Sequence, residues 1–417
     1  MRVFKFGGAS VKDAAGVKNI VEVLHKVGAQ QVLLVVSAMG KTTNKMELVV
    51  SNYFTNKAEM LSAINHVVVY HNQIIKELFP NPSHIVYDKI RSVFEDLTVF
   101  LERNKSPNYS FVYDQVVSLG EVLSTTIISE YMKSQNIENT WLDVRELIKT
   151  DDKYRDANVN WELTQKRIVS KVNSKTLSIT QGFLGSDKNN NTTTLGREGS
   201  DYTAAIFAYC LNAESVTIWK DVSGVLNADP RYFTKTELLH QISYEEAIEL
   251  AFYGASVIHP KTLQPLQRKE IPLYVKSFLN PEATGTCVSK GKQLEPLVPC
   301  FIVKKNQILL SLSSLDFSFI VEENISEVFA LLHKYKLRVD VIQNSAISFT
   351  VCVNDIYGNI EKLLHELRSK FRVRTNSGVS LYTIRHFNDS SLAEIENNKE
   401  VLFKQENRKT IQIITRD

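Results

Sequence analysis

Chemistry-bearing residues gather in the stretch TTTLGREGSDYTAA, which covers residues 192–205. Gly196 and Gly199 precede an apolar helical pattern, and the free N–H groups at a helix N-terminus bind anions. Arg197 adds a planar guanidinium group that suits a carboxylate or a phosphate. Asp201, in the first helical turn, can hold a cation or a lysine beside that anion. The alternative interpretation is a hairpin loop followed by an N-capped core helix.

A second candidate phosphate site is KFGGAS at residues 5–10, between the first expected strand and helix. Gly7 and Gly8 let backbone N–H groups approach a phosphate closely, and Lys5 supplies a cation at the end of the strand. The segment is neither a Walker A loop nor G-x-G-x-x-G, so these nucleotide-binding fingerprints are absent. A tight strand-to-helix turn with a surface lysine would also explain it.

Three further segments place polar groups at strand ends or helix starts, where open α/β sheets bind ligands. Glu121 is either a first-turn acid favoured by the helix dipole or a receptor for an ammonium group. Lys220 and Arg231 suit phosphates, although Asp229-Pro230 is also a plain turn signal. Phosphoryl transfer needs such cations, N–H donors and hydroxyls. The segments are VVSAMGKTTN at 35–44, SLGEVLST at 118–125 and WKDVSGVLNADPR at 219–231.

The elements that must position these residues alternate between strand and helix through roughly the first 300 residues. This alternation predicts an α/β fold, with an open, mainly parallel sheet sandwiched by helices. Asn189-Asn190-Asn191 predicts a hairpin tip. The expected strands cover residues 2–6, 31–37, 176–184, 215–219 and 272–277, and the expected helices cover 16–27, 58–79, 87–102, 118–134, 161–172, 201–211 and 244–252.

The pattern changes after residues 280–299, a stretch with prolines and glycines that we interpret as a linker. The next segment predicts β-α-β-β-α-β, the α+β ferredoxin-like arrangement, in about 70 residues. A remainder predicts a strand, a helix and a strand at 380–384, 392–403 and 410–414. We therefore expect a catalytic domain at 1–290, a ferredoxin-like domain at 305–378 and an incomplete second unit at 379–417.

Composition excludes several classes of function. The chain has 417 residues, 43% hydrophobic and 23% charged, with a net charge of +3, as in a multidomain globular protein. The chain has no basic block with interleaved aromatic residues, so nucleic acid is not a favoured partner. No window approaches the roughly 18 apolar residues of a membrane span. Met1 leads directly into an expected strand, which leaves no room for a signal peptide. The four cysteines lack metal-type spacing and lie mostly in apolar surroundings, which is typical of reduced core residues, so we expect a cytoplasmic protein.

Taken in order, these motifs resemble those of the aspartate kinases of the amino acid kinase superfamily, and the resemblance covers essentially the whole chain. A sixth matching motif is FYGASVIHP at 252–260. The resemblance implies transfer of the γ-phosphoryl group of ATP to the side-chain carboxylate of L-aspartate, giving 4-phospho-L-aspartate and ADP. This reaction is the first step toward lysine, threonine and methionine. It also implies that the C-terminal region is an ACT regulatory region.

The resemblance implies roles for individual residues. Lys5 and Asp201 would be catalytic, with Asp201 holding Lys5 and the magnesium-bound phosphates in place. No protein metal ligand is expected, because the ATP phosphates would hold Mg²⁺. The expected substrate-binding residues are Ser37, Thr43, Glu121, Arg197 and Ser200, and the expected nucleotide-binding residues are Gly7, Gly8, Ser10, Lys220, Asp221, Leu226 and Arg231.

The sequence departs from the family pattern at four positions. Ala9 stands where threonine is usual, and Leu226 where a tyrosine near the base is common. Glu198 replaces a frequent glycine, which would restrict the loop or repel phosphate. Ser256 stands where many members carry a lysine facing ATP, and we expect Lys220 to compensate.

The ACT region would bind an effector amino acid, lysine or threonine, and pair subunits into a homodimer or higher homo-oligomer. The strand RVDVIQNS at 338–345 matches the family and supplies the expected effector residues Val339, Asp340, Asn344 and Ser345. The loop at 321–324 lacks the glycine that usually opens the effector pocket. Two other functions remain open: a kinase acting on glutamate or a related acid, and a catalytically weak ACT-containing amino-acid sensor.

Overall fold

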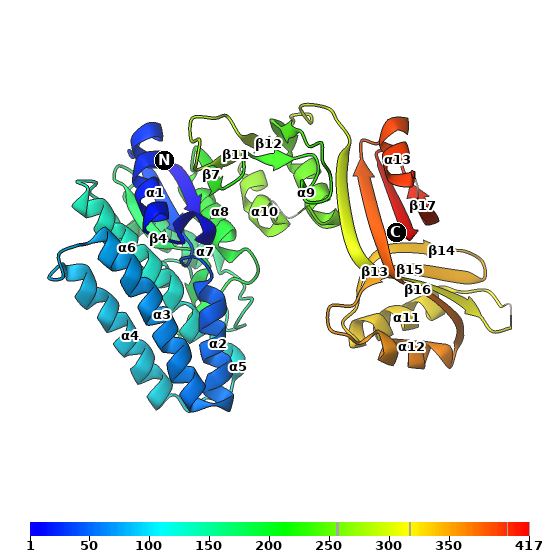
Figure 1. Ribbon diagram of the computed structural model, residues 1–417, viewed down its shortest axis with the longest axis horizontal. Helices are drawn as coiled ribbons and strands as arrows, with labels where there is room; N and C mark the ends of the chain where they lie inside the picture. Colours follow the sequence, from blue (N-terminus) through cyan, green and yellow to red (C-terminus); the bar gives the residue numbers. More distant parts are fainter. Residues whose placement is uncertain (256–257, 317, 398, 417) are drawn as a thin grey trace. The chain divides into compact units, whose positions relative to one another are not determined.

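The chain forms two compact units in a computed structural model that describes residues 1–255, 258–316, 318–397 and 399–416 (Figure 1). The larger unit contains Met1–Val225, Leu238–Ile248 and Val257–Pro296. The smaller unit contains Leu226–Glu237, Glu249–Ser256 and Leu297–Asp417. The predicted boundary after residue 290 therefore omits two short segments, because stretches of the first part of the chain belong to the C-terminal unit.

An eight-stranded sheet, in the order β10-β12-β11-β7-β1-β2-β4-β3, forms the centre of the larger unit. β1 (Arg2–Phe6) runs parallel to both β2 (Val32–Val36) and β7 (Ser215–Lys220). Every residue of β2 is buried, as expected for a strand with helices over both faces. The predicted α/β fold is confirmed. The other strands are β3 (Thr140–Leu142), β4 (Ser178–Gln181), β10 (Gln241–Ser243), β11 (Leu273–Ser277) and β12 (Thr286–Ser289).

β12 lies inside the predicted linker at 280–299 and pairs antiparallel with β11, so part of that linker is sheet. The hairpin tip expected at 189–191 joins β5 (Leu184–Ser186) to β6 (Thr192–Thr194). The sequence interpretation missed the strand character and the pairing of β12, because a four-residue strand between Gly285 and Gly291 carries little periodicity.

The seven expected helices are all present, and three helices were missed. α2 (Thr42–Thr55), α5 (Tyr109–Val117) and α10 (Pro260–Arg268) have weak or interrupted patterns, and α10 contains Pro265. Figure 1 shows α2 to α6 gathered beside the sheet. The expected helices are α1 (Ala14–Val27), α3 (Lys57–Leu78), α4 (Ile85–Arg103), α6 (Leu119–Ser134), α7 (Trp161–Lys171), α8 (Gly199–Leu211) and α9 (Tyr244–Tyr253).

A six-stranded antiparallel sheet, in the order β14-β15-β13-β16-β18-β17, organises the smaller unit. Its two long strands, β13 (Cys300–Ser314) and β16 (Phe371–Arg385), pair along most of their length. The predicted boundary at residue 378 falls inside β16, so the two expected C-terminal segments share one sheet. The remaining elements are α11 (Glu322–Lys334), β14 (Arg338–Asn344), β15 (Ser348–Asn354), α12 (Ile360–Arg368), α13 (Asp389–Glu396), β17 (Glu400–Glu406) and β18 (Thr410–Arg416).

The helix predicted at 392–403 is wrong beyond Glu396, because residues 400–406 form β17 and pair with β18. A small core explains why residues 226–237 join this unit. Ala228 and Phe233 pack there against Tyr382 and Ile384. Such long-range burial cannot be inferred from local sequence.

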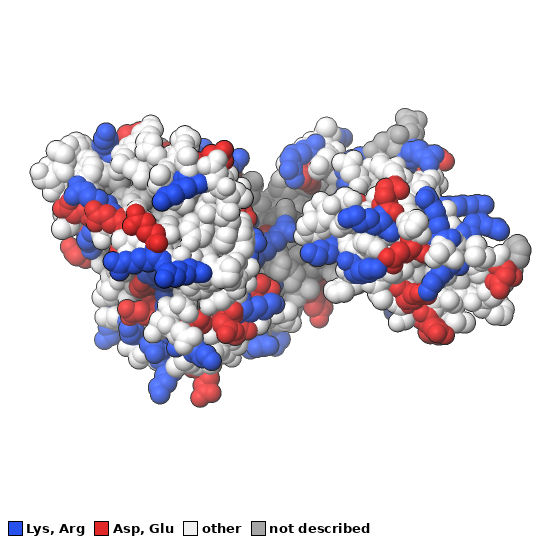
Figure 2. Space-filling model, turned by 90° about the horizontal axis from the view of Figure 1, so that it is seen from below, with Lys and Arg blue, Asp and Glu red and all other residues white. Residues whose placement is uncertain are grey.

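The surface of the larger unit carries interspersed charges: Figure 2 shows basic and acidic side chains mixed over the face drawn. Within the described residues, no helix combines the length and apolar character needed to cross a bilayer.

Candidate active site

A cavity of about 310 Å³ lies where β1 and β2 end and α6 and α8 begin. β2 and β7 run parallel to β1 on its two sides, and open α/β sheets bind ligands at the carboxyl ends of such strands. Seven of the predicted site residues meet there. The cavity is lined by Lys5, Ser37, Thr43, Glu121, Phe183, Gly196, Glu198, Gly199, Ser200, Asp201 and Lys220.

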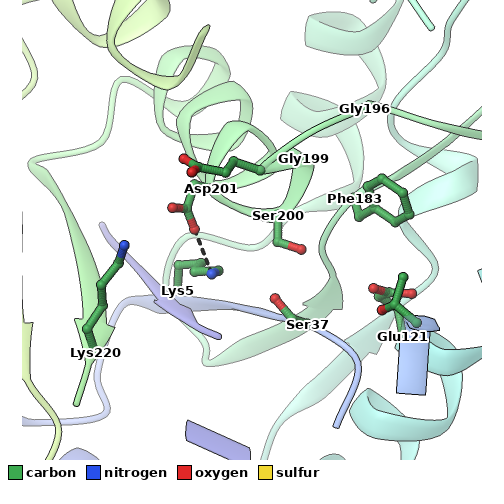
Figure 3. Close-up of a pocket in the computed structure, with 11 residues that line it drawn as sticks. Lys5, Ser37, Glu121, Phe183, Gly196, Gly199, Ser200, Asp201 and Lys220 are labelled. Carbon is green, nitrogen blue, oxygen red and sulfur yellow. Dashed lines mark ion pairs between the residues drawn. The ribbon is translucent and has the colours of Figure 1, made fainter. Parts of the chain in front are cut away.

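An ion pair organises one end of the cavity. Lys5 Nζ lies 2.6 Å from Asp201 Oδ1, and the two side chains are only 11% and 5% exposed (Figure 3). Lys5 comes from β1, and Asp201 from the first turn of α8. Lys220, at the end of β7, lies at this same end of the cavity in Figure 3. These cations beside a helix N-terminus make an anion-binding region.

Glu121 marks the other end. Figure 3 shows it near Phe183, with Ser37 and Ser200 between it and the Lys5–Asp201 pair. Glu121 is 2% exposed, and burial raises the pKa of its carboxyl to about 8. The Ala38 N–H donates to Oε1 at 3.4 Å, whereas Oε2 has no hydrogen-bond partner in the described part of the chain. A bound ammonium group would satisfy this carboxylate and favour its charged form.

The loop that closes the cavity is held by a buried acid outside it. Asp114 of α5 accepts hydrogen bonds from the Thr194 N–H at 2.9 Å, the Thr194 hydroxyl at 2.8 Å and the Arg155 N–H at 3.1 Å. Burial raises the pKa of Asp114 to about 6, against these hydrogen bonds. Sequence reasoning missed Asp114, because nothing distinguishes an acid inside an amphipathic helix from a surface residue.

Close packing gives the same loop its shape. A Cβ atom on Gly199 would lie 2.6 Å from Phe183 Cδ2, so a larger residue cannot fit without displacing Phe183. Phe183 itself has a φ of 71°, an unusual backbone conformation for a bulky residue. Its place two residues after the end of β4 at Gln181, beyond Gly182, is a sequence signal that could have marked it.

Several predicted site residues lie outside the cavity lining. Arg197 is exposed, and no residue in the described ranges forms a hydrogen bond or ion pair with it, although both its neighbours line the cavity. A Cβ on Gly7 would lie 3.3 Å from Lys5 Nζ, so Gly7 borders the lysine. Gly8 packs against the Ala38 carbonyl, where a Cβ would come within 2.7 Å. The Ser10 hydroxyl donates to the Trp219 carbonyl at 3.3 Å.

The predicted nucleotide-side residues beyond Lys220 are dispersed. Asp221 is exposed, and Leu226 and Arg231 belong to the C-terminal unit. The exposed Arg231 pairs with Asp229 at 2.5 Å, which matches a turn. Ser256, which stands where many family members carry a lysine facing ATP, lies outside the described residues.

The predicted effector residues lie on β14 and the turn after it. Asp340 Oδ1 pairs with Lys304 Nζ at 2.7 Å, with the carboxylate side chain 5% exposed. Val339 packs against the core beneath α11 and α12, and Asn344 is exposed. Ser345 forms a hydroxyl hydrogen bond with Ser348 at 2.6 Å.

Comparison with known proteins identifies the family. Residues 1–277 match the Amino acid kinase family. The chain belongs to this family. It is 34% identical to lysine-sensitive aspartokinase 3 of Escherichia coli K12 over 358 residues, which is 84% of this chain and 78% of that protein. This similarity places the chain among the aspartokinases.

Solved structures of E. coli aspartokinase III share the architecture of this amino acid kinase. Its complex with lysine and aspartate, in the T-state, has a TM-score of 0.84 at 28% identity, covering 99% of this chain and 95% of the other. Its complex with aspartate and ADP, in the R-state, has a TM-score of 0.81 at 28% identity, covering 100% and 96%. The matches extend over both units.

Proposed function

We propose that this chain is an aspartate kinase, which transfers the γ-phosphoryl group of ATP to the side-chain carboxylate of L-aspartate. The observation that carries the proposal is the two-ended cavity, with the Lys5–Asp201 pair at one end and Glu121 at the other. A carboxylate oxygen forms a bond to the γ-phosphorus, and the bond from that phosphorus to the β,γ-bridging oxygen breaks. The electron pair leaves with ADP. No general base is needed, because the aspartate carboxylate is ionised at neutral pH.

The geometry supports a division of roles among the predicted residues. Glu121 receives the substrate ammonium group, and Lys5, oriented by Asp201, stabilises the charge on the transferring phosphoryl group. Arg197 binds a substrate carboxylate when aspartate enters, since its side chain is exposed between two lining residues. The hydroxyl-bearing residues Ser37, Thr43 and Ser200 line the space between the two ends.

The nucleotide occupies the cationic end in this proposal, with Gly7 and Gly8 giving its phosphates access to backbone N–H groups beside Lys5. Asp201 carries hard carboxylate oxygens in the same cavity, a donor type that fits Mg²⁺. Bound Mg²⁺ would neutralise charge on the phosphates. Within the described residues, no group of three or more His, Cys, Asp or Glu could hold a metal ion alone. In this proposal the nucleotide phosphates supply most of the Mg²⁺ ligands.

Trapping the acyl phosphate with hydroxylamine tests this function. Protein incubated with ATP, Mg²⁺ and L-aspartate should yield the hydroxamate, and the Lys5→Ala variant should yield none while remaining folded. Product with L-glutamate instead of L-aspartate would show a different acceptor. Absence of hydroxamate with both acids would favour the amino-acid sensor, against which the Lys5–Asp201 pair now argues.

Regulation by lysine and pairing of subunits through the ACT region are further parts of the proposal. The similar E. coli enzyme has been crystallised with lysine. In this chain Asp340, a carboxylate suited to an amino-acid ammonium group, already pairs with Lys304. Titrating lysine and threonine into the hydroxamate assay tests the regulatory part, and flat curves for both would remove it. Sedimentation at several protein concentrations tests the subunit pairing.

A further inference from the structure

Glu198 has a backbone conformation that is unusual for its residue type. Its φ of 53° lies in the left-handed region, which is unfavourable for a residue that carries a Cβ atom. A glycine would adopt the same conformation without that cost. Strain of this kind persists where the surrounding structure or a bound ligand compensates for it.

Among the described residues, none forms a hydrogen bond with the Glu198 side chain that would hold the start of the helix. Glu198 occupies the N-cap position of α8, yet its side chain accepts no capping hydrogen bond. The helix start depends only on its backbone, whose carbonyl accepts from the N–H groups of Asp201 at 3.0 Å and Tyr202 at 3.2 Å. A glycine would support the same helix, so the start of α8 does not explain the carboxylate.

The carboxylate of Glu198 belongs to the cavity. The residue lines it, and its Oε2 atom is buried without a hydrogen-bond partner among the described residues. A buried carboxylate oxygen without a partner carries a desolvation cost that a ligand would remove. The Glu198 carbonyl accepts from the N–H of Asp201, which pairs with Lys5, so Glu198 lies at the cationic end where the nucleotide phosphates are proposed to bind.

Charge decides what kind of ligand this oxygen accepts. Lys5 is already paired with Asp201 at 2.6 Å, so Glu198 would face the nucleotide phosphates as an additional negative charge. An ammonium ligand has a better receptor in the more deeply buried Glu121, which Figure 3 shows apart from Asp201. A divalent cation between phosphate and carboxylate oxygens would instead turn the repulsion into attraction.

We infer that Glu198 is a protein ligand for the divalent cation that accompanies the nucleotide, so that the nucleotide is bound here as a metal complex held jointly by its phosphates and this carboxylate. The inference rests on the proposed function only in taking this end of the cavity as the nucleotide site. It predicts an unusually strong linkage between Mg²⁺ and nucleotide binding.

Calorimetric titration of ADP measures that linkage without catalysis. The dissociation constant of ADP is determined in EDTA and in saturating Mg²⁺ for the full chain, and their ratio is the linkage. In Glu198→Gln, ADP should bind more tightly than to wild type in EDTA, and the ratio should fall about tenfold or more, on the scale of a lost metal contact. The matched pocket variant Glu121→Gln should keep the wild-type ratio.

A second variant separates the side chain from the backbone. Glu198→Gly removes the carboxylate and fits the left-handed conformation, so it should keep a Tm at least equal to that of wild type while showing the same loss of linkage. Titration of Mn²⁺ into ADP-saturated protein, followed by the EPR signal of free Mn²⁺, should show weaker metal binding in both Glu198 variants.

The outcomes separate the two proposals. If hydroxamate forms with aspartate and both Glu198 variants keep the wild-type linkage, the metal assignment alone is overturned. If the linkage falls but no hydroxamate forms with aspartate, the metal assignment stands and the proposed function fails. Wild-type protein that binds no ADP under either condition would overturn both.

Discussion

The ammonium group of Lys5 and the carboxylate of Asp201, 2.6 Å apart, join the end of the first strand to the first turn of α8. Both side chains are almost fully buried, so neither charge can be removed without leaving the other unpaired in a poorly solvated site. The pair fixes a cation at the position where the proposed reaction develops negative charge.

A double-mutant cycle on this pair tests whether the two residues act as one unit. Lys5→Met and Asp201→Asn should each lower kcat by about 1,000-fold, and the double variant should lose little more than either single variant, because groups that act together are non-additive. Hydroxamate formation at saturating aspartate and ATP gives kcat. Losses that multiply in the double variant would show that Asp201 acts independently of Lys5.

Replacing Arg197 tests its proposed contact with substrate. Arg197→Ala should raise the KM for aspartate about 100-fold, on the scale of a lost charge-assisted hydrogen-bonded pair, with a smaller change in kcat. Initial rates over a range of aspartate concentrations measure both constants. Arg103→Ala, which removes an exposed arginine at the end of α4, is the control and should behave as wild type. An unchanged KM for Arg197→Ala would remove Arg197 from the substrate site.

Glu121 should make stability depend on pH. Its pKa of about 8 in the folded protein exceeds the 4.5 of an unperturbed carboxyl, so the folded state binds more protons between these values. The free energy of unfolding should therefore fall as the pH rises from about 5 to about 8. In Glu121→Gln that decline should be smaller. At pH 8 the free energy of unfolding of the variant should exceed that of wild type by on the order of a few kcal/mol, because one pKa unit corresponds to about 1.4 kcal/mol.

Urea unfolding at pH 5 and at pH 8 measures this effect. The exposed Glu138, changed to Gln, provides the control and should keep the wild-type difference between the two pH values. The same Glu121→Gln variant should bind aspartate more weakly, because a neutral amide replaces the receptor for the ammonium group. A pH dependence identical to that of wild type would place Glu121 in a more solvated environment than the structure shows.

Asp114 should contribute to stability through the loop that it holds. Asp114→Asn places an amide NH₂ against the N–H donors of Thr194 and Arg155, so the free energy of unfolding should fall by about 1–3 kcal/mol. Urea unfolding at pH 7.5 measures the change. Asp152→Asn, at an exposed position of the loop after η2 (Val144–Glu146), should change stability far less. Equal effects of the two substitutions would mean that the Asp114 hydrogen bonds add nothing.

Local sequence predicted the parts of the site whose chemistry and element share one short segment. KFGGAS and TTTLGREGSDYTAA each combine a strand end or helix start with charged groups, and Lys5, Ser200 and Asp201 do line one cavity. The same local reasoning missed α10, which contains Pro265, and failed for residues 400–406, whose strand depends on pairing with β18. A short segment cannot specify which distant partner will bury it.

The sequence by itself determined the strand and helix alternation of roughly the first 300 residues, the family, and the residues able to carry phosphoryl transfer. Only tertiary structure decided which of them meet. It assigned Leu226 and Arg231 to the C-terminal unit, left Arg197 exposed, and placed the Glu198 carboxylate in the cavity with a buried, unpartnered oxygen. The physical reason is that residue type and spacing record local propensity, whereas burial and charge pairing arise between segments far apart in the chain.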